Sequence, residues 1–353
     1  MGKSKAAYLS QMTAMQADFR SDTVTRPTQA MMQAMMQAPL GDDVLGDDPS
    51  VKQLEAYASD LFGMDDALFC PSGTMTNQIA IKAHTQPGDE LICSHLAHIY
   101  NYEGGGIAAN SGVQVRCGGD DLGRLTADDV KALIQPSGND HLAATQLISV
   151  ENTANKGGGT CMGLPLLEAV GRVAKSHNLA YHLDGARLFN ALVRDRENPK
   201  SYGQCFDSIS ICLSKGLGAP VGSLLLGSHA FIQSGRRIRK RMGGGMRQSG
   251  LLAAAGLYGL ENHVERLVED HTKAQQIDQW LSECSWVSER KPCETNMVLF
   301  KVTDGHQAPD IQERLASSGI HIVAMDSQWL RFVTHMDIND AHMAHLDQAL
   351  KGL

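Results

Sequence analysis

A lysine at the end of a buried strand is the first feature of this sequence that could do chemistry. Residues 208–213 (SISICL) alternate apolar and small side chains, a pattern typical of a strand packed on both faces. Lys215 follows, and Gly216 and Gly218 let the backbone turn and let another molecule approach closely. A partly desolvated ammonium is less stable than a solvated one, so this amine could act as a nucleophile. A solvated lysine at a strand end is the alternative, which this stretch alone leaves open.

A second apolar stretch ends in an aspartate. Residues 179–183 (LAYHL) precede Asp184, which stands roughly 30 residues before Lys215, about one strand-plus-crossover unit. Both side chains would then lie at the carboxyl ends of nearby strands, where open α/β sheets bind ligands. A Schiff-base lysine with an aspartate facing a pyridinium nitrogen is the pair typical of pyridoxal phosphate (PLP) enzymes.

Two more stretches have side chains suited to such a cofactor. Ser72, Gly73 and Thr74 precede a helical pattern, and the free N–H groups of a helix start bind phosphate. Plain N-capping by Ser72 or Thr74 would give the same pattern. His95 and His98 follow a short strand, and either ring could stack on a heteroaromatic ring or simply cap and pack.

Two arginines and an acidic loop admit more than one reading. Arg247 follows three glycines, which suggests close backbone approach to an anion. Arg331 lies in an apolar strand and needs an anionic partner, either a substrate carboxylate or a structural aspartate. Residues 40–49 (LGDDVLGDDP) carry four aspartates, but their spacing fits no EF-hand, and turn chemistry explains Gly and Asp equally well.

The composition limits the class of protein. The chain has 353 residues, of which 42% are hydrophobic and 20% charged, enough for one large and one smaller domain. A net charge of -8 favours neither nucleic acid nor an anionic membrane as a partner. The eight cysteines form no C-x-x-C pair, and the first 17 residues lack the apolar core of a secretory signal. We therefore expect a soluble, cytoplasmic protein with reduced cysteines.

Strand and helix patterns alternate through residues 68–228. This alternation predicts an α/β fold with a mainly parallel, doubly wound sheet. We expect an N-terminal arm at 1–27, a large cofactor-binding domain at 28–270 and a small α+β C-terminal domain at 271–353. A long helix at 251–268 is expected to connect the two domains.

Taken together, these segments resemble the low-specificity L-threonine aldolases, in the β-eliminating lyase group of fold type I PLP enzymes. The resemblance covers nearly the whole chain after residue 18. The motifs that carry it are FRSDTVTRPT (19–28), GDDVLGDDP (41–49), PSGTMTNQ (71–78), HIYNYEGGG (98–106), HLDGAR (182–187), SKGLGAPVGSLL (214–225), GGGMRQSGLLAAAG (243–256) and RFVTH (331–335).

The resemblance implies roles for individual residues. It implies that Lys215 carries the Schiff base, Asp184 faces the pyridinium nitrogen and His98 stacks on the cofactor. It also implies three groups of further contacts: phosphate ligands at Ser72, Gly73, Thr74 and, from a neighbouring subunit, Arg247; a substrate-carboxylate clamp of Ser21, Arg187 and Arg331; and Tyr102 beside the substrate's β-substituent. His98 and His141 are the candidates for handling the proton of the β-hydroxyl.

The resemblance further implies a dimer of dimers with shared active sites and a structural cation near Thr23 and Thr25, of unknown identity. The expected reaction is retro-aldol cleavage of L-threonine, L-allo-threonine and related β-hydroxy-α-amino acids to glycine and an aldehyde. The alternative is another fold type I enzyme that acts at Cα–H, such as a racemase, a transaminase or a β-eliminating lyase. This sequence departs from the family at Ala154, where a histidine is usual, so the preference between diastereomers stays open.

Overall fold

The computed structural model describes residues 15–353, which divide into two compact units. The large unit is Thr25–Val268; the small unit joins the stretch that ends at Val24 to Glu269–Leu353. Within residues 15–353, no helix has both the length and the apolar character that crossing a membrane requires.

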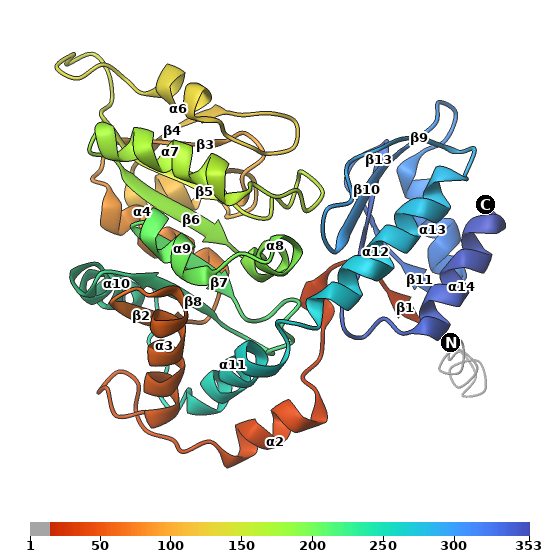
Figure 1. Cartoon of the computed structure of the whole chain (residues 1–353), viewed down its shortest axis with the longest axis horizontal. Helices are drawn as coiled ribbons and strands as arrows, with labels where there is room; N and C mark the ends of the chain where they lie inside the picture. Colours follow the sequence, from red (N-terminus) through yellow and green to blue (C-terminus); the bar gives the residue numbers. More distant parts are fainter. Residues whose placement is uncertain (1–14) are drawn as a thin grey trace, which may run out of the picture. The chain divides into compact units, whose positions relative to one another are not determined.

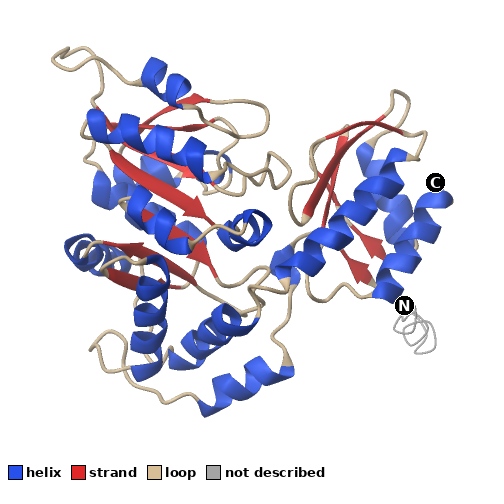
Figure 2. Cartoon of the chain, viewed as in Figure 1, coloured by secondary structure: helices blue, strands red, loops and turns tan. Residues whose placement is uncertain are grey.

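The large unit is built on a seven-stranded sheet, with helices on both of its faces (Figures 1 and 2). Its strands are β2 (Asp66–Cys70), β3 (Glu90–Ser94), β4 (Gln114–Gly118), β5 (Thr145–Glu151), β6 (Ala180–Gly185), β7 (Ser208–Cys212) and β8 (Ser223–Gly227). They pair in the order β2-β8-β7-β6-β5-β3-β4; β8 runs antiparallel to β2 and β7, and all other neighbouring pairs are parallel. The prediction of a mainly parallel sheet is confirmed.

The helices of the large unit follow or connect these strands. They are α2 (Gln29–Gln37), α3 (Pro49–Phe62), α4 (Gly73–His84), α5 (His98–Asn101), the π-helical turn η2 (Ile107–Ser111), α6 (Ala127–Leu133), α7 (Leu164–Ser176), α8 (Leu188–Asp195), α9 (Pro199–Cys205), α10 (His229–Arg241) and α11 (Gly250–Asn262). In α7, Leu167, Val170 and Ala174 recur at helical spacing and are buried, so one stripe of this helix packs on the sheet.

Apolar side chains that point alternately to the two faces of the sheet form a hydrophobic core on each face. Leu224 and Leu226 of β8 belong to the cluster that includes α3, α7 and α9, whereas Leu225 belongs to the cluster under α4 and α10. In β7, Ile209 and Ile211 face the first cluster. Successive side chains of a strand point to opposite faces, so Ser208 and Ser210 lie on the α4 side. Polar residues are thereby collected under α4.

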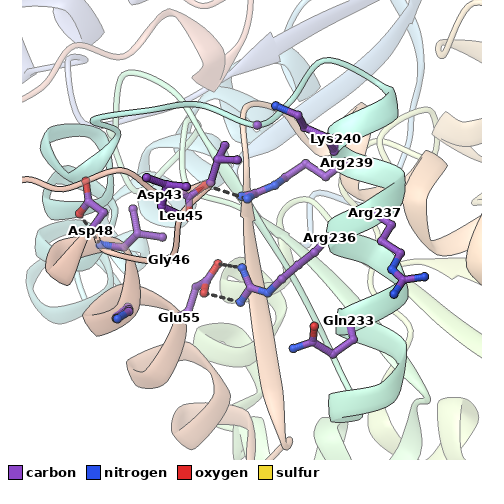
Figure 3. Close-up of a pocket in the computed structure, with 14 residues that line it drawn as sticks. Asp43, Leu45, Gly46, Asp48, Glu55, Gln233, Arg236, Arg237, Arg239 and Lys240 are labelled. Carbon is purple, nitrogen blue, oxygen red and sulfur yellow. Dashed lines mark hydrogen bonds and ion pairs between the residues drawn. The ribbon is translucent and has the colours of Figure 1, made fainter.

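The acidic loop at 40–49 is held by arginines and backbone N–H groups. Asp43 pairs with Arg239 at 2.7 Å, both side chains being buried, and Asp42 pairs with Arg247 at 2.9 Å. Asp48 accepts the backbone N–H groups at the start of α3. Figure 3 shows the contacts of Asp43 with Arg239 and of Glu55 with Arg236. All four residues line a cavity of about 460 Å³. These contacts favour the turn interpretation of the loop over a metal site.

The expected single helix at 251–268 is wrong. α11 ends at Asn262, and α12 (Leu267–Ser282) begins after a short break. His263 lies in this break, where its N–H bonds to the carbonyl of Gly259 and its Nδ1 lies 2.8 Å from the carbonyl oxygen of Leu217. The long-range contact with residue 217 holds the chain at this point, and local helical periodicity carries no information about it.

The small unit is an α+β structure. It comprises β1 (Ala17–Asp18), the 3₁₀ turn η1 (Asp22–Val24), most of α12, β9 (Val287–Arg290), β10 (Met297–Val302), α13 (Ala308–Ser317), β11 (Ile320–His321), β12 (Val323–Ala324), β13 (Trp329–Val333) and α14 (Asp340–Lys351). The expected strands at 297–302 and 329–334 pair antiparallel as β10 and β13. The aromatic part of its core consists of Phe19, Trp286, Phe300 and Phe332.

Candidate active site

Asp184 and Lys215 are brought together by the pairing of β6 with β7. The strands run parallel, Asp184 lies opposite Ser210, and Lys215 follows the end of β7 at Cys212. The carbonyl of Lys215 accepts hydrogen bonds from the Thr25 hydroxyl and from the N–H of Gly218, both at 2.9 Å. The main chain at the lysine is therefore held in place, as the strand-and-turn pattern predicts.

The carboxylate of Asp184 is buried and accepts two hydrogen bonds. Asp184 is 2% exposed. Oδ2 accepts from Nδ2 of Asn77 at 2.8 Å, and Oδ1 accepts from the N–H of Ala186 at 3.2 Å. Fixed donors hold the carboxylate in a single orientation at the carboxyl edge of the sheet, which is what a partner for a cationic ring nitrogen requires.

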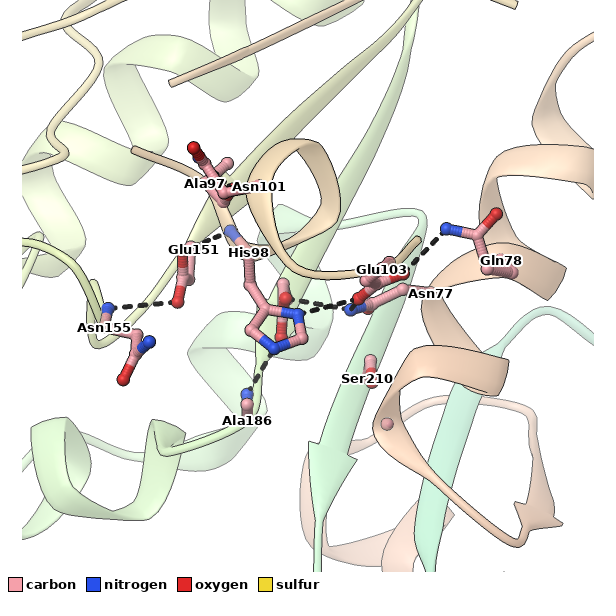
Figure 4. A network of polar contacts seen from close by, with 12 residues as sticks. Asn77, Gln78, Ala97, His98, Asn101, Glu103, Glu151, Asn155, Ala186 and Ser210 are labelled. Atoms are coloured by element: carbon pink, nitrogen blue, oxygen red, sulfur yellow. Dashed lines mark hydrogen bonds and ion pairs between the residues drawn. The ribbon is translucent and has the colours of Figure 1, made fainter. Parts of the chain in front are cut away.

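His98 is held at both its main chain and its ring. It is the first residue of α5; its N–H donates to Oε2 of Glu151 at 2.9 Å, and its Nδ1 lies 2.9 Å from Oε1 of Glu103 (Figure 4). Burial lowers the pKa of this imidazole, but the hydrogen bond with Glu103 and the charge of Asp184 raise it, and the net pKa lies above the ordinary value. His95, by contrast, bonds through Nδ1 to the carbonyl of Gly118 at the sheet edge.

Glu103 joins the imidazole to the aspartate through one amide. Its Oε1 accepts from Asn77 at 2.9 Å as well as contacting His98, and its Oε2 accepts from Nε2 of Gln78 at 2.7 Å. The amide of Asn77 thus bridges Glu103 and Asp184. His98, Glu103 and Asp184 are also the one group of the described residues whose geometry could hold a metal ion. The carboxylates of Glu103 and Asp184 already accept hydrogen bonds from the side-chain amides of Asn77 and Gln78.

Glu151 is a second buried carboxyl beside Asp184. Its oxygens accept the N–H groups of His98 and Asn155, the latter at 3.0 Å. Burial, followed by the charge of Asp184, raises the pKa of Glu151 to about 7. This carboxyl therefore changes its charge near neutral pH.

This raised pKa predicts how stability varies with pH. Below pH 4.5 the carboxyl is protonated whether the chain is folded or unfolded, but between pH 4.5 and about 7 only the folded chain keeps the proton. The unfolded chain then binds fewer protons, so the contribution of Glu151 to stability falls as pH rises, by about 3 kcal/mol over this window, and is constant above it. Urea unfolding of the cofactor-free protein at a series of pH values measures this.

Glu151→Gln is the variant for that experiment, and Glu168→Gln, on the exposed face of α7, is its control. The stability of wild type relative to Glu151→Gln should fall between pH 4.5 and 7, whereas the difference from Glu168→Gln should show no such fall. A constant difference between wild type and Glu151→Gln across this range would mean that Glu151 is ionised throughout.

The start of α4 lies beside the end of β7. Ser72 is the N-cap, its Oγ accepting the N–H of Met75 at 3.2 Å, and Gly73 is the first helical residue. A Cβ built on Gly73 would lie 2.6 Å from Sγ of Cys212. Only glycine allows the helix start to come so close to the strand. Capping and phosphate binding are compatible here, because one side chain caps the helix while other N–H groups stay directed outward.

Gly73→Ala should destabilise the protein by about 1–3 kcal/mol, because the added methyl group overpacks this contact. Cys212→Ala removes the sulfur atom that the methyl group would meet. The double variant should therefore be more stable than the sum of the two single effects predicts, as measured by urea unfolding of the cofactor-free chain. Strict additivity would contradict the contact between these two residues.

The remaining predicted residues of the large unit lie in different surroundings. Arg187 is buried, and its Nη1 lies 3.4 Å from Oδ1 of Asn155. Tyr102 is 46% exposed, with its ring centroid 5.6 Å from that of His98. Ala154 is buried, and its main chain forms an isolated antiparallel β-bridge with Thr160. Arg187 contacts Asn155, which bonds to Glu151, and the ring of Tyr102 lies beside that of His98. Both residues therefore lie next to the cluster already described.

Two predicted residues are not brought to this cluster within one chain. His141 is exposed in the loop before β5, at the amino end of that strand, whereas Asp184 and Lys215 lie at carboxyl ends. Arg247 pairs with Asp42 on the surface. Their assigned roles stay predictions.

Three predicted residues belong to the small unit. Arg331 of β13 is 8% exposed, and its Nη2 donates to the carbonyl of Arg20 at 3.2 Å. Ser21 accepts the N–H of Thr23 at 3.2 Å, and its Oγ lies 2.9 Å from that of Thr23. The substrate role of Ser21 and Arg331 and the cation role of Thr23 and Thr25 stay predictions.

Sequence reasoning missed Asn77, Glu103 and Glu151 as parts of the site. Each stands inside or near a feature of the sequence analysis: Asn77 in PSGTMTNQ, Glu103 in HIYNYEGGG, and Glu151 three residues before Ala154, as the last residue of β5. A polar residue within a helix or a turn is ordinary by itself. Only their convergence on His98 and Asp184 distinguishes them.

This chain is similar in sequence to known proteins over most of its length. The sequence profile of the β-eliminating lyase family matches residues 18–304. The low specificity L-threonine aldolase of Escherichia coli (strain K12) is 43% identical over 332 residues, which cover 93% of this chain and 96% of that protein. Low-specificity L-threonine aldolase 1 of Arabidopsis thaliana is 40% identical over 333 residues, which cover 92% of this chain and 93% of that protein.

Solved structures show the same fold. Leishmania major threonine aldolase superposes with a TM-score of 0.83 at 22% identity, over 95% of this chain and 99% of that one. Sphingomonas wittichii serine palmitoyltransferase superposes with a TM-score of 0.73 at 16% identity, over 96% of this chain and 86% of that one. At these identities the likeness concerns the fold alone.

Proposed function

Since the chain belongs to the β-eliminating lyase family, we propose that it is a PLP-dependent aldolase that cleaves L-threonine and L-allo-threonine to glycine and acetaldehyde. Related β-hydroxy-α-amino acids, phenylserine among them, would be cleaved to glycine and the corresponding aldehyde. The architecture is that of fold type I PLP enzymes. The observation that carries the proposal is the placement of Asp184 and Lys215 at the carboxyl ends of two adjacent parallel strands.

The residues present fit the cofactor. Asp184 offers a buried carboxylate for the ring nitrogen, Lys215 offers a primary amine, and Ser72, Gly73 and Thr74 offer a helix start for the phosphate. At Gly73 a Cβ would collide with Cys212, so the absence of a side chain keeps this edge open. The donor set therefore matches an anionic phosphate at one end and a cationic ring nitrogen at the other.

When bound, PLP supplies a pyridinium ring that accepts the electron pair released when the Cα–Cβ bond breaks. Asp184 keeps the ring nitrogen cationic, because a fixed anion beside it favours the protonated form. Lys215 would provide the amine that holds the cofactor until a substrate amine takes its place. His98, which Glu103 orients through Nδ1, would stack on the ring.

The proton of the substrate's β-hydroxyl must leave as the aldehyde carbonyl forms. Because Nδ1 of His98 is directed to Glu103, Nε2 is the nitrogen available to take that proton, directly or through water. General-base catalysis of this kind typically contributes about 10²–10⁴-fold in rate. His141 is the other candidate, and it would have to act from a second copy of the chain, because its own lies at the amino end of β5.

Arg187 is proposed to bind the substrate carboxylate from the large unit, a role that the resemblance also assigns to Ser21 and Arg331. Tyr102 is proposed to border the β-substituent. The proposed assembly is a homotetramer, a dimer of dimers, in which Arg247 of one subunit binds the cofactor phosphate in another. We place the enzyme in the cytoplasm, with small amino acids as its substrates and with no nucleic-acid or membrane partner.

The experiment that tests this function is a side-by-side assay with PLP and L-threonine, L-allo-threonine or L-phenylserine. Aldehyde and glycine released in equal amounts from any of the three supports the aldolase. Keto acid or inverted amino acid without aldehyde, from protein that holds the cofactor, would show chemistry at Cα–H instead. The ranking of the substrates gives the diastereomer preference of this chain, which has alanine at position 154.

A further inference from the structure

A chain of hydrogen bonds leads from Asp184 through the layer under α4 to a second histidine. Oδ2 of Asp184 accepts from Nδ2 of Asn77 at 2.8 Å, and Oδ1 of Asn77 lies 3.2 Å from Nε2 of His182. Nδ1 of His182 lies 2.8 Å from the hydroxyl of Ser208, which lies 2.9 Å from Nε2 of His84. Within this chain only Asp184 and Asn77 belong to the site already described.

Asn77 sets the direction of the first link. Its Nδ2 contacts two carboxylates, Asp184 at 2.8 Å and Glu103 at 2.9 Å. A carboxylate accepts and does not donate, so both hydrogens of this amide nitrogen are used. Oδ1 of Asn77 is then an acceptor, and Nε2 of His182 must carry the hydrogen that binds it.

His182 is buried and His84 is half-buried, and both are neutral. His182 is 0% exposed, and burial lowers its pKa to about 3. Burial also lowers the pKa of His84 to about 4, and its ring stacks on Phe231 with the centroids 4.5 Å apart. Asp207 acts in the opposite direction on His84, but burial dominates. In a neutral ring with hydrogen on Nε2, Nδ1 can only accept.

The remaining links follow from these two facts. Nδ1 of His182 accepts, so the hydroxyl of Ser208 donates to it. The oxygen of Ser208 is then free to accept from Nε2–H of His84. Each donor therefore points toward Asp184, and the dipoles along the chain add in one direction.

We propose that His84, Ser208, His182 and Asn77 form a polarised hydrogen-bond chain that stabilises the negative charge of Asp184, with His182 as its central positioning residue. The functional part of this inference rests on the proposed function, in which that charge faces the cofactor. The carboxyls of Glu103 and Glu151 lie close to Asp184 and repel its charge when they are ionised, whereas the donors to Asp184 are the neutral groups of Asn77 and Ala186. Aligned hydrogen bonds strengthen one another and so offset that repulsion.

Neutron diffraction from crystals of the deuterated protein tests the direction of the chain without any assay of activity. The expected result is deuterium on Nε2 of His182 and Nε2 of His84, with the deuterium of Ser208 directed to Nδ1 of His182. Deuterium on Nδ1 of His182 would reverse the link to Ser208 and overturn the proposal. This result does not depend on the reaction the enzyme catalyses.

Variants test what the chain does for the cofactor. His182→Leu removes the donor to Asn77, and Ser208→Ala removes the donor to His182. Each variant should lower kcat by up to about tenfold, the rate equivalent of one neutral hydrogen bond, with little change in KM. His182→Gln keeps an N–H that can reach Asn77 and should restore most of kcat. The acidic limb of the kcat profile should move to higher pH in the first two variants, and so should the pH titration of the bound cofactor's visible absorbance.

Ser210→Ala is the matched control. Ser210 lies in the same strand as Ser208, on the same face and equally buried, but it bonds to Thr76 and not to the chain. Its absorbance titration should match wild type. If Ser208→Ala also matches wild type while remaining folded by circular dichroism, the proposal is wrong. If no substrate is cleaved, the absorbance titration still decides it, so failure of the aldolase assignment is seen separately.

Discussion

Lys215→Ala should abolish multiple turnover, with a loss of at least about 10⁴-fold in kcat, because no other amine lies at the end of β7 to hold the cofactor and exchange it with the substrate. Its main chain is fixed by Thr25 and Gly218, so the substitution removes the amine and leaves the backbone contacts intact. The loss should therefore be chemical and should not reflect unfolding.

Borohydride reduction gives a second measurement for this variant. In wild type it should attach the cofactor covalently to the peptide that contains Lys215, and in Lys215→Ala no covalent product should form. Lys175→Ala, an exposed position in α7, is the control and should behave as wild type in both assays. Continued turnover of Lys215→Ala would rule out its assigned role.

Asp184→Asn should keep the cofactor bound but lower kcat by about 10²–10⁴-fold, the range that follows from removing one partner of a buried charge pair. The asparagine side chain also cannot accept both of the hydrogen bonds that Asp184 accepts. Both oxygens of Asp184 accept N–H groups, from Asn77 and Ala186, so an amide must turn its own NH₂ toward one of these donors. Absorbance of the bound cofactor and kcat, measured on the same preparation, separate binding from rate.

Asp207→Asn is the matched control for that experiment. Asp207 lies immediately before β7, at the amino end of the same sheet, and its carboxylate also accepts a backbone N–H, that of Tyr181 at 2.8 Å. Like Asp184 it belongs to the central part of the sheet and accepts a backbone N–H, but it lies at the opposite end of the strands, so kcat of Asp207→Asn should stay near wild type. An unchanged rate in Asp184→Asn would remove the electrostatic role given to this residue.

Much of the fold follows from local patterns. The apolar and small residues at 208–213 and the stripe of α7 report which faces are buried, because burial requires side chains with period two in a strand and about 3.6 in a helix. Parallel strands separated by crossovers then bring Asp184 and Lys215 to one edge of the sheet. The break between α11 and α12 escaped these patterns, because a contact with Leu217, distant in sequence, holds it.

Residue types and motif order by themselves determined the lysine–aspartate pair, the cofactor and the family. These depend on strand ends and glycine turns, which are local in sequence. Only the tertiary structure decided which polar residues serve that pair: Glu103 rather than solvent orients His98, Asn77 bridges the two carboxylates, and His182 and Ser208 line up behind them. The physical reason is that hydrogen-bond partners from α4, α5, β6 and β7 are set by packing between elements, and spacing along the chain does not record it.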